Sequence, residues 1–148
     1  FHAGTATNVI PDQAELTGTV RTLLPDVQDM AEARISQIAT GVAAAHGAEA
    51  DCTYMRGYPV TVNHAEQTHH AAEAAAAIAG EAQVEREVNP MMGAEDFSYM
   101  LKARPGAFIF IGNGNTAGLH NAAYDFNDAI IPWGISYWAR LAENRLAA

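Results

Sequence analysis

Apolar and polar residues alternate along residues 14–23, AELTGTVRTL. Leu16, Gly18 and Val20 fall on one face of an extended chain, and Arg21 falls on the other, polar face. A period of two is typical of a half-buried strand, because successive side chains point to opposite faces. We therefore predict a strand over residues 14–23 that carries Arg21 on its polar side.

A helical period follows at once. Between Pro25 and His46 apolar residues recur at steps of three and four, which indicates one amphipathic helix; they are Val27, Ala31, Ile35, Ile38, Val42 and Ala45. Pro25 suits the first turn, and Gly47 suits the left-handed position just past the end. Residues 48–59, AEADCTYMRGYP, alternate again and predict a second strand. Strand, helix and strand would form one compact unit.

The pattern of apolar and polar residues changes after this second predicted strand. Gly57 and Pro59 interrupt the pattern, so we place a domain boundary near Tyr58. Residues 1–58 are predicted to be one domain, and residues 59–148 to belong to another.

The second region predicts three helices and two short strands. Asn63 is expected to cap an alanine-rich helix that runs to Gly80, with Glu66 completing a capping-box-like pair. Residues 83–87, QVERE, are a short strand candidate, and residues 107–111, AFIFI, read as a strand covered on both faces. This alternation of strands and helices predicts an α/β protein.

Two further helices are expected around that apolar strand. Glu95 and Asp96 should occupy the first turn of a helix that Pro105 ends, where acids complement the helix dipole. A last helix should begin near Pro132. Its inward residues are predicted to be Ile135, Trp138, Leu141 and Leu146.

Composition and charge narrow the classes of partner. The 148 residues are 49% hydrophobic, and the formal net charge is −9. A folded globular protein is expected, and its acidity argues against binding to nucleic acid or to anionic membranes. No apolar run approaches the roughly 18 residues that a membrane span needs. Small molecules or other proteins are the better partners.

The single cysteine and the first residue add two expectations. Cys52 has no second cysteine to pair with, which favours a reducing, cytoplasmic setting. The chain opens on Phe1, in what reads as the approach to a strand, so we expect a piece of a longer protein.

Metal-binding patterns are weak when taken residue by residue. Zinc usually takes about four donors, often announced by a local pair such as HExxH, and the sequence has no such pair. His69 and His70 are adjacent, so on a helix their side chains diverge by about 100°. His120 differs in context, because it lies in the irregular loop 112–128 after the apolar strand, where α/β proteins often keep functional groups. From spacing alone, a structural role for His120 is the more common case.

Other candidates also have two readings. Asp125 and Asp128 would either orient the second ring nitrogen of His120 or cap the following helix. Glu95 and Asp96 would be either an acid–base pair or ordinary helix N-terminal acids. Arg21 would be either a clamp for a carboxylate, since its donors form a planar fork, or half of a surface salt bridge.

Five blocks together point further: GTATNVIPDQAELTGTVRT, RGYPVTVN, MGAEDFSYML, PGAFIFIGNG and LHNAAYDFND. In this order and at these distances they resemble the C-terminal half of the zinc-dependent amidohydrolases of the aminoacylase and hippurate hydrolase type, which include the auxin-conjugate hydrolases. The resemblance extends from Gly4 to about Leu141. It implies a two-domain enzyme, in which a smaller lid domain interrupts an α/β catalytic domain that holds two metal ions.

On this resemblance, residues 1–58 are the second half of the lid, which commonly forms a homodimer, and residues 59–148 return to the catalytic domain. His120 matches the last metal ligand of the family. Asn8 and Arg21 match lid groups that contact the scissile carbonyl and the substrate carboxylate, and Gly93 matches a block that closes the substrate pocket through its backbone.

The resemblance also shows what this sequence lacks. The family's other metal ligands, its general-base glutamate and the lid histidine supplied across the dimer belong to the N-terminal half, and His2 does not match that lid histidine. Two zinc, manganese or cobalt ions per complete site are implied. We therefore predict hydrolysis of the amide bond of N-acyl amino acids by the parent protein, and no activity for residues 1–148 alone. The alternative is a dimerisation or ligand-binding module without catalysis.

Overall fold

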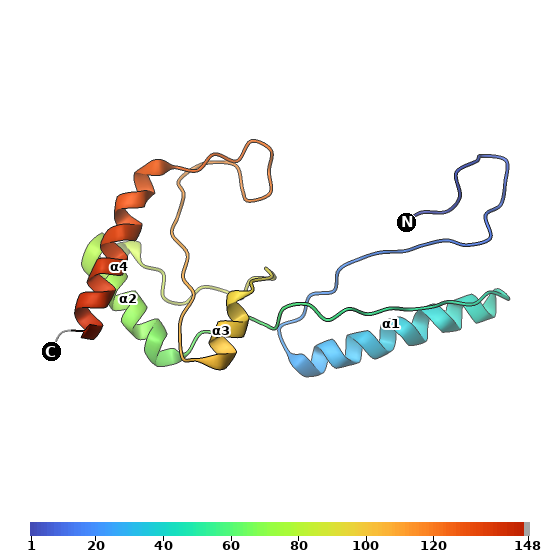
Figure 1. The fold of residues 1–148 in the computed structure, drawn as a ribbon, viewed down its shortest axis with the longest axis horizontal. Coiled ribbons are helices and arrows are strands. Elements are labelled where there is room, and N and C mark those ends of the chain that lie inside the picture. The colour runs from blue at the N-terminus through green and yellow to red at the C-terminus, as the bar shows by residue number, and fades with distance from the viewer. Residues whose placement is uncertain (147–148) are drawn as a thin grey trace. The chain divides into compact units, whose positions relative to one another are not determined.

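A computed structural model describes residues 1–146. The chain divides into two compact units, of which the first is Phe1–Arg56 and the second begins at Gly57. Their assignment to a lid and a catalytic domain stays a prediction. The helical elements, labelled in Figure 1, are α1 (Pro25–Ala45), α2 (Ala65–Ala79), the 3-10 turn η1 (Glu81–Gln83), α3 (Phe97–Ala103), the 3-10 turn η2 (Asp128–Ile130) and α4 (Ile131–Leu146).

The first unit is built around α1. The predicted helix is confirmed: proline occupies its first turn, and the backbone of Gly47 just beyond its end has a φ of 71°. A residue with a side chain would be strained in that left-handed conformation, whereas glycine adopts it freely. None of the side chains of α1 is buried within the described chain.

Two acids of α1 hold the segment that follows it. The guanidinium of Arg56 lies 2.7 Å from Oδ1 of Asp29, and its Nε donates to Oε2 of Glu32 at 2.8 Å. These two carboxylates raise the pKa of Arg56, the Glu32 hydrogen bond contributing most. Figure 1 shows the extended segment running back alongside α1. Because all three side chains are substantially exposed, the pairs fix the path of the chain more than they stabilise it.

The predicted strands do not form. Across residues 1–146 the only β-type pairing is an isolated antiparallel bridge, in which the backbones of His2 and Glu15 exchange two hydrogen bonds of 2.8 Å. Residues 14–23, 48–59, 83–87 and 107–111 carry no ladder, and η1 takes up the start of the third. Residues 1–146 are therefore helical with extended connections, and the α/β character that the sequence predicts is not seen in them. Side-chain alternation indicates which face of a strand would be covered, but a strand also needs a neighbouring backbone to pair with.

The second unit has a small core between α2 and α4, which lie side by side in Figure 1. Ala71 and Ala74 of α2 pack against Tyr137 of α4, which is only 5% exposed. Burial raises the pKa of the Tyr137 hydroxyl. Small alanines on α2 allow the large ring to approach its backbone closely. Partly buried side chains complete the cluster: Ala75, Ala107, Ile109 and Leu141.

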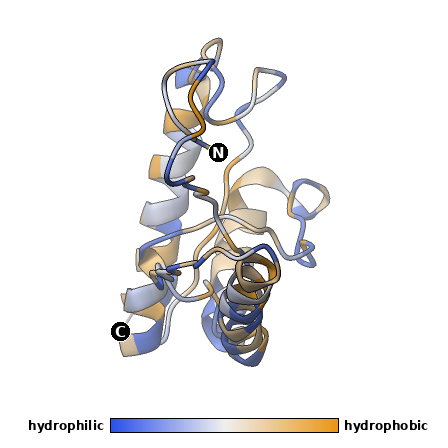
Figure 2. Ribbon diagram, turned by 90° about the vertical axis from the view of Figure 1, so that its right-hand side faces the viewer, coloured by the Kyte–Doolittle hydropathy of each residue, from blue (hydrophilic) through white to orange (hydrophobic). Residues whose placement is uncertain are grey.

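The inward face of α4 is not the predicted one. Ile135 is 65% exposed, Trp138 is 64% exposed and Leu146 is also exposed, whereas Tyr137 points into the core and only Leu141 of the expected set packs there. Figure 2 shows hydrophobic residues interleaved with hydrophilic ones along this helix. The helix is apolar on more than one side, so its period alone could not tell which side would meet α2.

The start of α2 also differs from expectation. His64, not Asn63, is the N-cap residue, and no side chain caps the helix. Gly80 ends it as predicted. Likewise, Asp96 is the N-cap residue of α3 and Glu95 precedes it, so both acids lie just outside the first turn. The two acids thus lie one and two residues before Phe97, the first residue of α3, and not inside its first turn as predicted.

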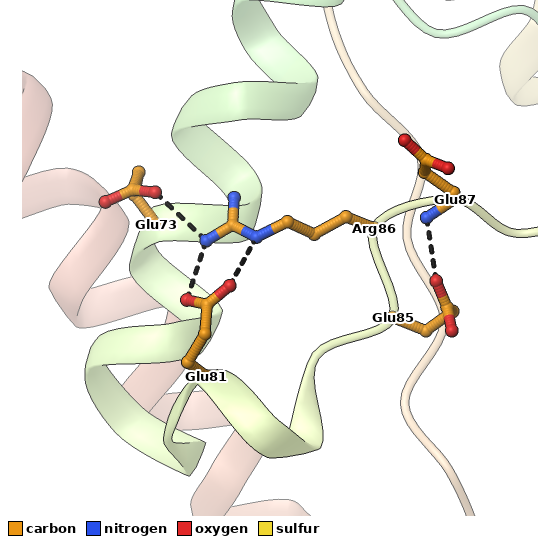
Figure 3. Close-up of polar contacts among 5 residues, drawn as sticks. All are labelled: Glu73, Glu81, Glu85, Arg86 and Glu87. Atoms are coloured by element: carbon orange, nitrogen blue, oxygen red, sulfur yellow. Dashed lines mark hydrogen bonds and ion pairs between the residues drawn. The ribbon is translucent and has the colours of Figure 1, made fainter.

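An ion-pair cluster ties η1 to α2 (Figure 3). Arg86 donates from Nε and Nη2 to the two carboxylate oxygens of Glu81 at 2.7 and 2.8 Å, and from Nη2 to Glu73 at 3.0 Å. The fork geometry suits a planar guanidinium. It lowers the pKa of Glu81 and raises that of Arg86. In the described part of the chain, no helix has the length and hydropathy required to cross a membrane.

Candidate functional site

The loop between residues 112 and 128 connects the apolar segment 107–111 to α4. Its far end is anchored by Asn127, whose side-chain oxygen accepts a hydrogen bond of 3.1 Å from the Ala129 backbone and so caps η2. Because η2 leads directly into α4, one end of the loop is fixed to a long helix.

The two ends of the loop are joined by asparagine side chains. The Oδ1 of Asn113 accepts from the backbone N–H of Asn127 at 2.8 Å, and its Nδ2 donates to the carbonyl of Asp125 at 2.8 Å. A longer contact of 3.4 Å runs from Nδ2 of Asn127 to the carbonyl of Asn113. Thr116 adds a hydroxyl contact to the same Asp125 carbonyl at 3.3 Å.

His120 stands midway along this loop with an unusual backbone. Its φ is 64°, and within residues 1–146 it is the one residue other than glycine with a positive φ. This left-handed conformation is uncommon for a residue with a side chain and often marks a functional site. Asn121 supports the turn that follows, since its Oδ1 accepts from Ala123 N at 2.9 Å and its carbonyl accepts from Tyr124 N at 2.9 Å.

The imidazole of His120 is exposed. Among the residues that the structure describes, it makes no hydrogen bond, so no described residue occupies either ring nitrogen. Asp125 takes part in the loop through its backbone carbonyl, and Asp128 begins η2. Neither carboxylate forms a hydrogen bond to the His120 ring, so the possibility that one of them orients it finds no support.

The donor set shows what this chain can contribute to a metal site. No group of three or more His, Cys, Asp or Glu side chains that could hold a metal ion occurs within residues 1–146. A histidine on a loop fixed at both ends suits a role as one ligand. These residues therefore fit one corner of a metal site and do not complete one.

The predicted substrate-binding residues occur in both units. Asn8 and Arg21 are exposed residues of the first unit, and the Arg21 guanidinium forms no salt bridge with any residue of the described range. The surface-salt-bridge reading of Arg21 is thus unsupported. Gly93 lies in the second unit, exposed, with no atom within 4 Å of the place a Cβ would occupy. Its backbone is open to a ligand.

Glu95 and Asp96 fit the second of their two interpretations, that of ordinary acids at a helix N-terminus. The carboxylate of Glu95 accepts a 3.4 Å contact from the backbone N–H of Phe97, at the start of α3. This is the position of a helix N-terminal acid. No hydrogen bond joins the Glu95 and Asp96 carboxylates, so an acid–base pair finds no support among the described residues.

Sequence reasoning missed the asparagines that shape the loop. A polar hollow of about 480 Å³ is lined by residues 113–116 and 125–128, where the two ends of the loop meet. Asn113 and Asn127 have no periodicity to reveal them. The available signal was the asparagine-rich GNGN directly after an apolar segment. In the structure, Gly114 of this stretch has a φ of 86°.

Comparison with known proteins gives a consistent picture. The family model described as peptidase family M20/M25/M40 matches residues 5–144. A hippurate hydrolase of Campylobacter jejuni is 36% identical over 142 residues, which cover 96% of this chain and 37% of that protein. An N-acetylcysteine deacetylase of Bacillus subtilis is 35% identical over 140 residues, covering 95% and 36%.

A solved structure agrees with these relatives. The YXEP protein of Bacillus subtilis, described as a dinuclear metal-binding peptidase from the M20 family, superposes with a TM-score of 0.80 at 34% identity. The match covers 98% of this chain and 40% of that one. The chain therefore spans well under half the length of the relatives it matches.

Proposed function

We propose, on the premise that this chain belongs to peptidase family M20/M25/M40, that the protein of which it is part hydrolyses the amide bond of N-acyl amino acids. The names of the two relatives support this class, since one is a hippurate hydrolase and the other an N-acetylcysteine deacetylase. The observation that carries the proposal is His120, exposed at the midpoint of a loop whose two ends are joined. It offers an imidazole where the family resemblance implies a metal ligand.

His120 would hold one of two divalent metal ions. The dinuclear relative of known structure supports metal-dependence in general, while zinc, manganese or cobalt all suit imidazole and carboxylate donors. A bound divalent metal lowers the pKa of water and stabilises negative charge developing on a carbonyl oxygen. The remaining donors and the general base would come from other parts of the whole protein.

Arg21, Asn8 and Gly93 would bind the substrate. The Arg21 guanidinium is exposed and free of carboxylate partners in the described chain, so it would pair with the substrate carboxylate through its planar fork. The Asn8 amide would donate to the carbonyl region of the scissile amide. The open backbone of Gly93 would line the pocket, where a side chain would obstruct it.

The first unit offers a surface for a homodimer. None of the α1 side chains is buried, and apolar residues such as Met30, Ile38 and Val42 are each more than half exposed. Burial of such residues is favourable in proportion to the apolar area removed from water. We therefore propose that this unit pairs with its copy in the whole protein. Cys52 is free and exposed, and a cytoplasmic location stays our expectation.

The test is hydrolysis of N-benzoylglycine and of N-acetyl amino acids by the whole protein, before and after removal of metal by a chelator. We expect release of the free amino acid, its loss on chelation and its return on adding zinc, manganese or cobalt. Residues 1–148 assayed alone should be inactive. Unchanged hydrolysis by the fully metal-depleted protein would overturn metal dependence. No hydrolysis under any metal, with dimerisation intact, would favour the non-catalytic module.

A further inference from the structure

The loop that carries His120 has a specific closure at its neck. Asn113 and Asn127 lie at equal separation along the chain on either side of His120, and they are joined by the hydrogen bond from Asn127 N to Asn113 Oδ1 at 2.8 Å. We call this pair, with the Asp125 carbonyl that Asn113 also engages, the asparagine clasp.

Asn113 is suited to this position because its side-chain amide has both a hydrogen-bond acceptor and a donor. Its Oδ1 accepts from the backbone of Asn127 while its Nδ2 donates to the backbone of Asp125. An aspartate would keep the first bond and lose the second, since an ionised carboxylate only accepts. An alanine would lose both, and the Asn127 N–H and Asp125 carbonyl would lose their partner.

Asn127 transmits the closure to the body of the second unit. Its Oδ1 accepts from Ala129 N at 3.1 Å, at the start of η2, and η2 runs directly into α4. The N-terminal end of the loop is thereby attached, through Asn113, to the same helix as its C-terminal end. Gly114, the residue after Asn113, has a φ of 86°, a backbone conformation that favours glycine.

His120 needs such support more than an ordinary loop residue does. Its left-handed backbone costs free energy, and its exposed ring is held by no hydrogen bond in residues 1–146. Fixing the backbone of a free loop also costs conformational entropy. If the loop is already closed before a metal binds, less of that cost falls on metal binding.

We propose that Asn113 and Asn127 are positioning residues, and that the asparagine clasp sets the metal affinity of His120 by holding its loop in the binding conformation. The inference rests on the proposed function, because it takes His120 as a ligand. It adds that affinity for one metal ion depends on side chains that do not touch the metal.

The experiment measures zinc affinity of the whole protein by competition with a chromophoric chelator, alongside the melting temperature of the metal-free form. Asn113→Ala should weaken one of the two zinc sites by roughly 10- to 100-fold, as for other groups that orient metal ligands. Asn113→Asp, which keeps one bond, should fall between wild type and Asn113→Ala. Asn127→Asp keeps the oxygen that accepts from Ala129 N and loses only the longer 3.4 Å contact from Nδ2 to the Asn113 carbonyl, so its zinc affinity should lie closer to wild type than that of Asn113→Ala.

The matched control is Asn115→Ala. Asn115 is an exposed asparagine of the same loop, and its side chain makes no hydrogen bond to any described residue. It should bind zinc as wild type does. His120→Ala should lose one zinc site entirely.

The outcomes separate the two proposals. If Asn113→Ala and Asn113→Asp bind both zinc ions like wild type while His120→Ala loses one, the clasp proposal fails and the proposed function stands. The clasp proposal also fails if Asn113→Ala only lowers the melting temperature of the metal-free form, because that is a purely structural effect. If His120→Ala retains both zinc ions, the ligand assignment fails and the clasp proposal fails with it.

Discussion

The side-chain amide of Asn63 pairs with the backbone of Phe108 as a neighbouring strand would. Asn63 Nδ2 donates to the Phe108 carbonyl and Phe108 N donates to Asn63 Oδ1, both at 2.8 Å. One residue on, the backbone N–H of His64 donates to the carbonyl of Gly106 at 3.0 Å. These contacts hold the apolar segment 107–111 against the start of α2 in the absence of any ladder within residues 1–146.

Replacing Asn63 should therefore loosen segment 107–111. In Asn63→Ala both hydrogen bonds are lost, and we expect a loss of about 1–2 kcal/mol in local stability, at the lower end of the range because the contact is exposed. Hydrogen exchange followed by mass spectrometry on peptides that cover Phe108 should report faster exchange. Asn89→Ala is the control, since Asn89 is an exposed asparagine with no side-chain hydrogen bond in the described chain. Equal exchange in both variants would contradict this role.

Ser98 is completely buried in α3, yet its hydroxyl has no hydrogen-bond partner in the described residues. A buried hydroxyl without a partner is costly, and removing it relieves that cost. We predict that Ser98→Ala leaves the free energy of unfolding unchanged or raises it by about 1 kcal/mol. The midpoint of urea denaturation measures this, with the exposed Ser136→Ala on α4 for comparison. A clear loss of stability in Ser98→Ala alone would show that the hydroxyl is satisfied.

The α2–α4 core should not tolerate enlargement at Ala74, which is 0% exposed and packs with Tyr137. Ala74→Leu inserts carbon atoms where no space exists, and overpacking of this kind typically costs about 1–3 kcal/mol. Ala77→Leu makes the same substitution at an exposed position of the same helix, so it should leave the stability nearly unchanged. Thermal unfolding compares the two. Equal melting temperatures for both variants would mean that the core is looser than the structure shows.

The Arg86–Glu81 pair should give the protein an acid-sensitive element. Arg86 lowers the pKa of Glu81 below its ordinary value of 4.5. A carboxylate whose pKa is lower in the folded state stabilises the fold above its unfolded pKa, and this contribution disappears as pH falls through the folded pKa. Arg86→Met should therefore unfold at lower urea than wild type near pH 7, and the difference should narrow below about pH 4.5.

Because the Arg86–Glu81 pair is exposed, added salt should also narrow the difference in urea midpoint between wild type and Arg86→Met. Arg104→Met is the matched control, since within residues 1–146 the Arg104 side chain donates only to the backbone carbonyl of Ala103, at 2.8 Å. Its unfolding should show no such pH-dependent difference from wild type. If the urea midpoint of Arg86→Met stayed below that of wild type by the same amount from pH 7 to pH 3, the ion pair could not be the cause of the difference.

Local signals in the sequence located the helices well. Pro25 and Gly47 bracket α1, and Gly80 ends α2, because proline and glycine impose backbone conformations that need no tertiary partner. Strands were over-predicted for the opposite reason. Their existence depends on another backbone, and residues 107–111 meet an asparagine side chain instead.

The candidate site shows a similar division. The block resemblance singled out His120, but the residues that hold its loop were missed because they act through single hydrogen bonds between side chain and backbone. Asn113 and Asn127 meet only when the loop closes, and no linear period predicts that closure. Asn63, expected as a helix cap, likewise found a more distant partner.

The central claim is that His120 is a metal ligand, and its most direct test is metal content. The whole protein and its His120→Ala variant would be purified in parallel, equilibrated with the same buffered zinc concentration and analysed by inductively coupled plasma mass spectrometry. We predict two zinc ions per wild-type chain and one per variant chain, with both proteins folded by circular dichroism. Two zinc ions bound by a folded His120→Ala variant, at wild-type affinity, would contradict the claim.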